Sequence, residues 1–132
     1  MIDTLMIVDD NAIDQKLYAR LATRSGLVGA LHGFLMAPDA LDFLAQPDRP
    51  VIDIILLDIN MPRMNGFEFL DAATSRFGPG FVRAAVIMLT TSMSDKDRKR
   101  ADSYAVVRDY IQKPLEMVHL QEIDTMLREG AL

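Results

Sequence analysis

The chain contains no cysteine, so neither a disulfide nor a thiolate metal site can be present. Positive charge is scarce, with 14 Lys and Arg against 19 Asp and Glu and a formal net charge of -5. Nucleic acid and anionic membranes call for a basic face, which this balance does not favour. No run of apolar residues is long enough to span a bilayer. The N-terminus lacks the basic segment of a targeting peptide. We therefore expect a soluble, cytoplasmic protein that binds neither nucleic acid nor membrane.

The sequence also lacks a Gly/Ser linker, a shift of composition and an internal repeat. Half of its 132 residues are hydrophobic and a quarter are charged, which is ordinary globular composition. A chain of this length buries about two-thirds of the surface that it exposes when unfolded. The last predicted helix ends close to the C-terminus. We therefore expect one domain over residues 1–132, with no output domain.

Apolar runs alternate with amphipathic segments along the whole chain. The runs predict strands near residues 5–8, 31–36, 53–58, 84–89 and 106–111. The segments predict a first helix capped by Asp10 or Asn11 and ended by Ser25-Gly26, then helices near residues 38–47, 65–77, 94–104 and 115–128. This alternation is typical of an α/β domain with a parallel sheet, in which right-handed crossovers leave few topologies.

The predicted helices differ in their apolar faces. Three of them carry apolar residues that are expected to face inward: Ile13, Leu17 and Leu21 at four-residue spacing; Phe69, Leu70 and Ala73; and Leu120, Ile123 and Leu127 on one face. The helix near residues 94–104 has almost no apolar stripe. We expect that helix to pack loosely on the sheet, and a weakly held element is easily shifted between two states.

Polar side chains follow four of the predicted strands at their carboxyl ends. Asp9 and Asp10 end the first strand, Asp58 the third, residues 90–92 the fourth and Lys113 the fifth. Ligands of open parallel sheets bind at these ends, near the point where strand order reverses. Residues far apart in the sequence are therefore expected to meet in one crevice.

The chemistry of these residues predicts a phosphoryl site. Three neighbouring carboxylates repel one another unless a cation neutralises them, and oxygen ligands without His or Cys favour magnesium. Lys113 can pair with a carboxylate or with a phosphoryl oxygen. An aspartate can be the nucleophile of phosphoryl transfer, which needs mainly positioning and charge neutralisation from the protein.

Four short motifs occur in order with matching spacing. They are Val8-Asp9-Asp10, the run from Leu56 to Pro62 followed by Gly66, Leu89-Thr90, and Lys113-Pro114. In these motifs the chain resembles the receiver domain of two-component response regulators from about residue 5 to residue 127. Single-domain chemotaxis regulators and the stand-alone regulators of sensor kinases, including phytochrome-like ones, are the most similar types. The resemblance implies a flavodoxin-like, doubly wound sheet of order 2-1-3-4-5 with five helices.

The resemblance also implies a phosphoacceptor and a magnesium site. Asp58 is then the phosphoacceptor and a metal ligand. Asp10 binds magnesium directly, Asp9 binds it mainly through water, and the backbone carbonyl of Asn60 is a further ligand.

The remaining implied roles concern the fourth and fifth strands. Thr90 is the switch hydroxyl, although the spacing to Lys113 is one residue longer than in the chemotaxis regulator and leaves Thr91 as the alternative. Tyr110 is the aromatic residue that turns inward with the switch. Lys113 pairs with the phosphoryl oxygens, and the bond from Lys113 to Pro114 is a cis peptide.

The function implied is a stand-alone switch and not an enzyme, beyond assisting its own phosphorylation and dephosphorylation. A sensor histidine kinase or a histidine phosphotransfer protein phosphorylates Asp58 in a magnesium-dependent reaction, docking near Ile13, Lys16 and Leu17 and on the loop after Lys113. The output is a downstream target, a relay protein or the kinase itself. A homodimer is a further candidate assembly.

Parts of the sequence also fit two other functions and two purely structural roles. A phosphatase of the aspartyl-phosphate type needs a second Asp two residues after the nucleophile, where this chain has Asn60. A degenerate receiver that only binds partners is expected to lack the acidic pair, the acceptor or the lysine, all of which are present. Asp9 and Asp10 can also act as helix caps, as can Ser92 or Ser94.

Overall fold

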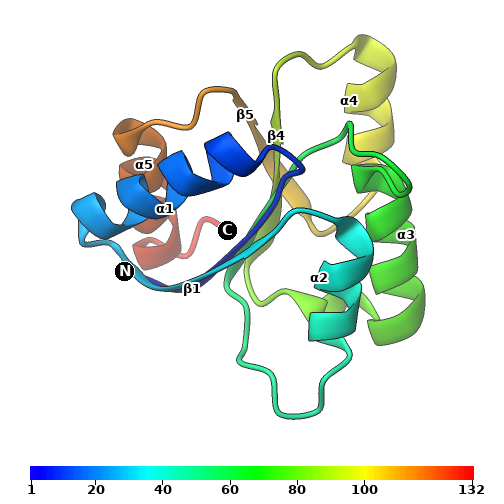
Figure 1. Cartoon of the computed structure of the whole chain (residues 1–132), viewed down its shortest axis with the longest axis horizontal. Coiled ribbons are helices and arrows are strands. Elements are labelled where there is room, and N and C mark those ends of the chain that lie inside the picture. The colour runs from blue at the N-terminus through cyan, green and yellow to red at the C-terminus, as the bar shows by residue number, and fades with distance from the viewer.

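The five predicted strands form one parallel sheet in a computed structural model that describes residues 1–132 (Figure 1). The strand order is β2-β1-β3-β4-β5, as expected for the flavodoxin-like fold. The strands are β1 (Ile2–Val8), β2 (Val28–Phe34), β3 (Ile54–Leu57), β4 (Ala85–Thr90) and β5 (Val107–Gln112). The central strands β3 and β4 are buried along their whole length, which explains their continuous apolar runs.

The boundaries of the edge strand β2 differ from the prediction. The sequence predicted a strand over residues 31–36, whereas β2 begins at Val28 and ends at Phe34. It pairs with β1 in register from Ile2 opposite Val28 to Val8 opposite Phe34. Backbone pairing with β1 therefore sets the ends of β2, and the apolar content of the segment does not reveal them.

Helices connect the strands and begin at identifiable caps. They are α1 (Ala12–Ser25), α2 (Ala37–Leu44), α3 (Gly66–Phe77), α4 (Asp95–Asp102) and α5 (Met117–Arg128), with a short 3₁₀ turn, η1 (Pro79–Phe81), before β4. Asn11 caps α1 by accepting a hydrogen bond from the backbone of Asp14, and Ser94 caps α4 in the same way. These caps decide between the alternatives that the sequence offered.

The helices form two layers, one on each face of the sheet. Figure 1 shows α1 and α5 on one side and α2, α3 and α4 on the other. Alternate residues of β1 enter the two cores: Leu5 and Ile7 face α1 and α5, and Met6 and Val8 face the other layer. No helix combines the length and the apolar character needed to cross a membrane.

The outer helices bury very different amounts of apolar surface. Helix α1 buries Tyr18 and Ala22, whereas Ile13 is 72% exposed and Leu17 is 52% exposed. The regularly spaced apolar residues of α1 therefore do not all face the sheet. In α4 only Ala101 is buried, which agrees with the missing apolar stripe.

Candidate functional site

The carboxyl ends of β1, β3, β4 and β5 bring the predicted site residues into one region. The backbone N–H of Asp58 donates to the carbonyl of Val8 at 3.0 Å, which joins the ends of β1 and β3. The N–H of Lys113 donates to the carbonyl of Thr90 at 2.8 Å, which joins the ends of β4 and β5. The sheet backbone thus positions Asp58, Lys113 and Thr90.

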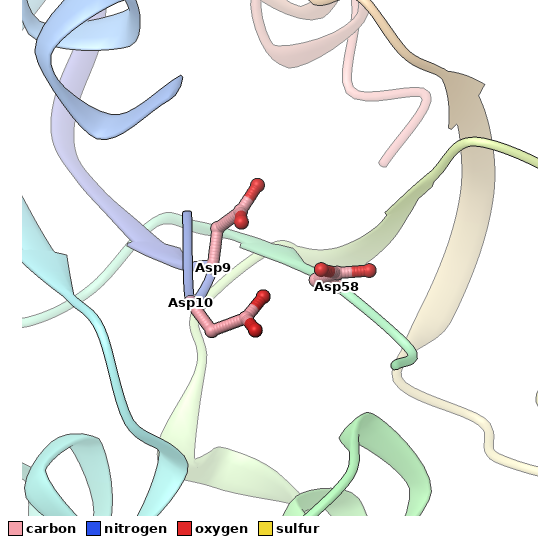
Figure 2. A group of neighbouring side chains, drawn as sticks. All are labelled: Asp9, Asp10 and Asp58. Atoms are coloured by element: carbon pink, nitrogen blue, oxygen red, sulfur yellow. The ribbon is translucent and has the colours of Figure 1, made fainter. Parts of the chain in front are cut away.

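Three aspartates form a compact acidic cluster. Figure 2 shows Asp9 and Asp10 at the end of β1 and Asp58 at the end of β3, around a shared space. One carboxylate oxygen of each lies within 4.8 Å of the others. Asp9 is fully buried and Asp58 is 6% exposed, while Asp10 is exposed. Hard oxygen donors this close together, without nitrogen or sulfur ligands, are the donor set that magnesium prefers.

Lys113 is the cation of the site. Its Nζ lies 2.8 Å from Asp9 Oδ2, 3.4 Å from Asp58 Oδ2 and 3.7 Å from Asp14 Oδ2. Burial alone would lower the pKa of Lys113, but the hydrogen bond to Asp9 and the charges of Asp58 and Asp9 raise it above its usual value. Lys113 is therefore a permanently charged partner for the carboxylates.

Asp58 is not fully neutralised by that lysine. Burial raises the pKa of its carboxyl, Lys113 lowers it, and the charge of Asp9 raises it again, with a net increase. Oδ1 of Asp58 accepts only a long hydrogen bond, 3.4 Å, from the backbone of Asn60. The ionised carboxylate is thus short of positive charge, and a cation bound between the three aspartates would supply it.

Two residues that hold Asp9 were not identified from the sequence. Tyr18 donates its hydroxyl hydrogen to Asp9 Oδ2 at 3.2 Å. Gln15 Nε2 lies 3.2, 3.1 and 3.0 Å from the carbonyls of Ile7, Asp9 and Phe34, across the ends of β1 and β2. Burial raises the pKa of Tyr18, and the charge of Asp9 raises it further. The only hint in the sequence was that Tyr18 lies one helical turn after Asp14, which places the two side chains on the same face of α1.

Gly66 lies directly behind the loop that follows β3 and begins with Asp58. Its N–H donates to the carbonyl of Ile59 at 2.8 Å. A Cβ atom at this position would lie 2.4 Å from the carbonyl oxygen of Asp58, closer than atoms can pack. The start of α3 can therefore approach the loop after β3 only because residue 66 has no side chain.

The two consecutive threonines at the end of β4 have different surroundings. Thr90 is buried, and its Oγ1 donates to the carbonyl of Ser92 at 3.0 Å. Thr90 and the partly buried Tyr110 line the same hollow. Thr91 is exposed and lines a different groove. The peptide bond between Lys113 and Pro114 is cis.

That second groove lies between α1 and the connection from β5 to α5. Its lining includes Leu17, Tyr18 and Leu21 of α1, together with Lys113 and Leu115. Lys113 therefore borders the groove on one side and contacts the acidic cluster on the other.

Comparison with known proteins gives consistent matches along the chain. The sequence profile of the response regulator receiver domain matches residues 5–124. The probable methanogenesis regulatory protein FilR2 of Methanothrix harundinacea is 30% identical over 128 residues, covering 95% of this chain and 81% of that protein. A two-component response regulator from Cytophaga hutchinsonii superimposes with a TM-score of 0.85 at 26% identity, over 97% of this chain and 98% of that one. A two-component response regulator from Legionella pneumophila superimposes with a TM-score of 0.79 at 27% identity, over 98% of this chain and 99% of that one.

Other curated relatives are much longer than the matched region. The chain spans 52% of the two-component response regulator ORR1 of Oryza sativa and 6% of the hybrid signal transduction histidine kinase B of Dictyostelium discoideum. The family profile nevertheless covers most of the chain, and the fold agrees with it. The chain therefore belongs to the response regulator receiver domain family of two-component systems.

Proposed function

We propose that this receiver domain is a phosphorylation switch in which Asp58 accepts a phosphoryl group from a histidine kinase or a histidine phosphotransfer protein. The observation that carries the proposal is the convergence of Asp9, Asp10 and Asp58 with Lys113 at the strand ends. The domain assists only its own phosphorylation and dephosphorylation, so it acts as a switch and not as an enzyme with a separate substrate.

The transfer needs little covalent chemistry from the protein. A carboxylate oxygen of Asp58 attacks the phosphorus of the phosphohistidine, and the P–N bond breaks as the new P–O bond forms. The electron pair of the broken bond stays on the imidazole nitrogen of the donor. The Lys113 ammonium, 3.4 Å from Asp58 Oδ2, is in position to pair with the phosphoryl oxygens.

Magnesium is the proposed cofactor. The carboxylates of Asp10 and Asp58 and the backbone carbonyl of Asn60 would hold it, with Asp9 acting mainly through water. A water-mediated role suits Asp9, because its two oxygens already accept hydrogen bonds from three donors. The ion would neutralise charge on the transferring phosphoryl group.

Thr90 is the proposed switch hydroxyl, and Tyr110 is the aromatic residue that moves with it. Burial of Thr90 in the hollow that Tyr110 also lines favours this choice. Thr91 is exposed and lines the groove beside α1 instead. In the present structure the Thr90 hydroxyl bonds to Ser92, so it would have to turn to reach a phosphoryl group on Asp58.

The proposed phosphodonor docks on α1. Ile13 and Leu17 are large apolar residues left exposed there, and Leu17 borders the groove that leads to Lys113. The output is read by another protein: a target, a phosphotransfer protein or the kinase itself, with a second copy of the chain as a further candidate. Hybrid histidine kinases among the curated relatives agree with a place in a phosphorelay.

The test is intact-mass spectrometry after incubation with acetyl phosphate, with and without magnesium. We expect one phosphoryl adduct on the parent protein, dependent on magnesium and absent from Asp58→Asn. Asp42→Asn removes an exposed carboxylate from α2 and should keep the adduct. Absence of an adduct from the parent, together with failure to bind beryllofluoride, would overturn the switch and leave a domain that only binds partners.

A further inference from the structure

Tyr18 places a buried phenol beside the acidic cluster. The residue is 4% exposed and belongs to the core between the sheet and the α1–α5 layer. Packing explains the aromatic ring, since phenylalanine would fill the same space. Packing does not explain the hydroxyl, which donates to Asp9 Oδ2 at 3.2 Å.

The hydrogen bonds of Asp9 show what this hydroxyl does. Oδ2 of Asp9 is contacted by Lys113 Nζ at 2.8 Å and by the Tyr18 hydroxyl at 3.2 Å. Oδ1 accepts from the backbone N–H of Asn11 at 3.0 Å. Each carboxylate oxygen has two lone pairs, so Oδ2 is fully occupied and Oδ1 keeps one free.

The three donors come from separate parts of the fold. The Asn11 N–H belongs to the turn before α1, Tyr18 to the middle of α1, and Lys113 to the end of β5. Together they fix the rotation of the Asp9 carboxylate about its Cβ–Cγ bond. Without the Tyr18 hydroxyl, the lone pairs of Oδ1 and Oδ2 would be equally available for a further donor.

We propose that Tyr18 is a positioning residue of the acidic cluster, which commits Asp9 Oδ2 to Lys113 and leaves Oδ1 as the oxygen that accepts from a metal-bound water. The proposal rests on the proposed function for the presence of magnesium. Tyr18 itself contacts neither the metal nor the phosphoryl group. It acts through the orientation of Asp9, as outer hydrogen bonds do in other metal sites.

The test compares Tyr18→Phe with the parent protein by calorimetric titration of magnesium in the absence of any phosphodonor. Phenylalanine keeps the ring in the core and removes only the hydroxyl. We expect magnesium binding to weaken about tenfold, the lower end of what outer hydrogen bonds contribute in metal sites. The thermal midpoint of the metal-free protein should change little, because Lys113 and the Asn11 N–H still satisfy Asp9.

Tyr104→Phe is the matched control. It also removes a tyrosine hydroxyl, one that donates to Asp71 Oδ1 of α3 at 2.6 Å from the segment after α4, away from the acidic cluster. Its magnesium affinity should equal that of the parent protein. A comparable loss of affinity in both variants would mean that removing any such hydroxyl disturbs the fold, and it would overturn the positioning role.

Failure of this proposal differs from failure of the proposed function. If the parent protein binds magnesium and Tyr18→Phe binds it equally well, Tyr18 only packs and the switch mechanism stands. If the thermal midpoint of metal-free Tyr18→Phe falls together with its magnesium affinity, the hydroxyl supports the fold as a whole and the positioning role is rejected. If the parent protein itself binds no magnesium, the proposed function fails and the role of Tyr18 toward the metal fails with it.

Discussion

The guanidinium carbon of Arg98 lies 5.0 Å from the centre of the Tyr110 ring, so α4 is held to β5 by a cation–π contact. A second contact of this kind joins α4 to α3, where the guanidinium of Arg100 lies 4.7 Å from the centre of the Phe67 ring. Each is worth about 0.5–1 kcal/mol at an exposed site. Only Ala101 of α4 is buried, so these contacts and the ion pair of Arg100 with Asp71 add to a small apolar contact.

Arg98→Ala should therefore loosen α4 and free the Tyr110 ring. We expect faster amide exchange in α4 by about two- to fivefold, which corresponds to the loss of about 0.5–1 kcal/mol of local stability. Exchange in the central strands β3 and β4 should not change. Hydrogen–deuterium exchange with mass spectrometry measures both.

Lys99→Ala is the control for that measurement, because Lys99 lies on the same helix and is exposed. Amide exchange in α4 of Lys99→Ala should match that of the parent protein.

A beryllofluoride complex of the parent protein should also alter amide exchange in α4, if this weakly held helix is the element that phosphorylation shifts. Identical exchange in α4 with and without beryllofluoride would contradict that role.

Gly66→Ala tests whether the loop after β3 tolerates a side chain on α3. The added Cβ would lie 2.4 Å from the carbonyl oxygen of Asp58, and a backbone atom cannot move aside as a flexible side chain can. We expect a loss of about 1–3 kcal/mol in the free energy of unfolding, as for other overpacked sites. Urea denaturation measures the loss, and the displaced Asp58 should also take up phosphoryl groups more slowly.

Gly80→Ala provides the comparison for Gly66→Ala. A Cβ at residue 80 meets no atom within 4 Å. The substitution should leave stability unchanged or raise it by up to about 1 kcal/mol, since alanine restricts the unfolded chain. Equal destabilisation by both substitutions would show that the contact with Asp58 is not the cause.

Asp58→Asn should stabilise the metal-free protein at neutral pH. The pKa of Asp58 is raised in the folded protein, so the folded state binds the proton more tightly than the unfolded state. The stability that protonated Asp58 contributes is fully present below its pKa in the unfolded chain, about 3.9. It is lost as pH rises through the higher pKa of Asp58 in the folded protein. The unfolding midpoint of Asp58→Asn should exceed that of the parent at pH 7, and the gap should narrow on acidification.

That comparison requires EDTA, because a bound cation would itself neutralise Asp58. Added magnesium should stabilise the parent protein and have less effect on Asp58→Asn, since a ligand that binds only the folded state raises stability. A parent protein that is more stable than Asp58→Asn in EDTA at pH 7 would show that Lys113 compensates the buried charge in full.

Leu17→Ala should affect partner binding and leave folding unchanged. Leu17 is half exposed on α1, and a surface substitution of this kind changes stability by less than about 0.5 kcal/mol. Phosphorylation by acetyl phosphate should continue at the parent rate, while transfer from a cognate kinase should slow. Leu120→Ala, on the buried face of α5, should instead lower the free energy of unfolding by about 2–5 kcal/mol. Unchanged kinase transfer in Leu17→Ala would remove α1 as the docking surface.

The sequence by itself determined the sheet and the meeting of its strand ends. Apolar runs that stop at Asp9, Asp58 and Lys113 belong to buried parallel strands, and such strands place their carboxyl ends along one edge. The family motifs specified the order 2-1-3-4-5, which the structure confirms. These inferences depend on the periodicity of apolar residues, the order of the motifs and the residue types, all of which can be read along a chain.

Only the tertiary structure decided which side chains support the site. Tyr18 and Gln15 reach the acidic cluster from the buried side of α1, and Arg98 covers Tyr110 from a helix without an apolar face. The ends of β2 likewise followed its pairing with β1. Each of these features depends on distances of a few ångströms between atoms on different elements. Hydrophobic periodicity fixes which face of an element is buried, but not which atoms on two faces meet.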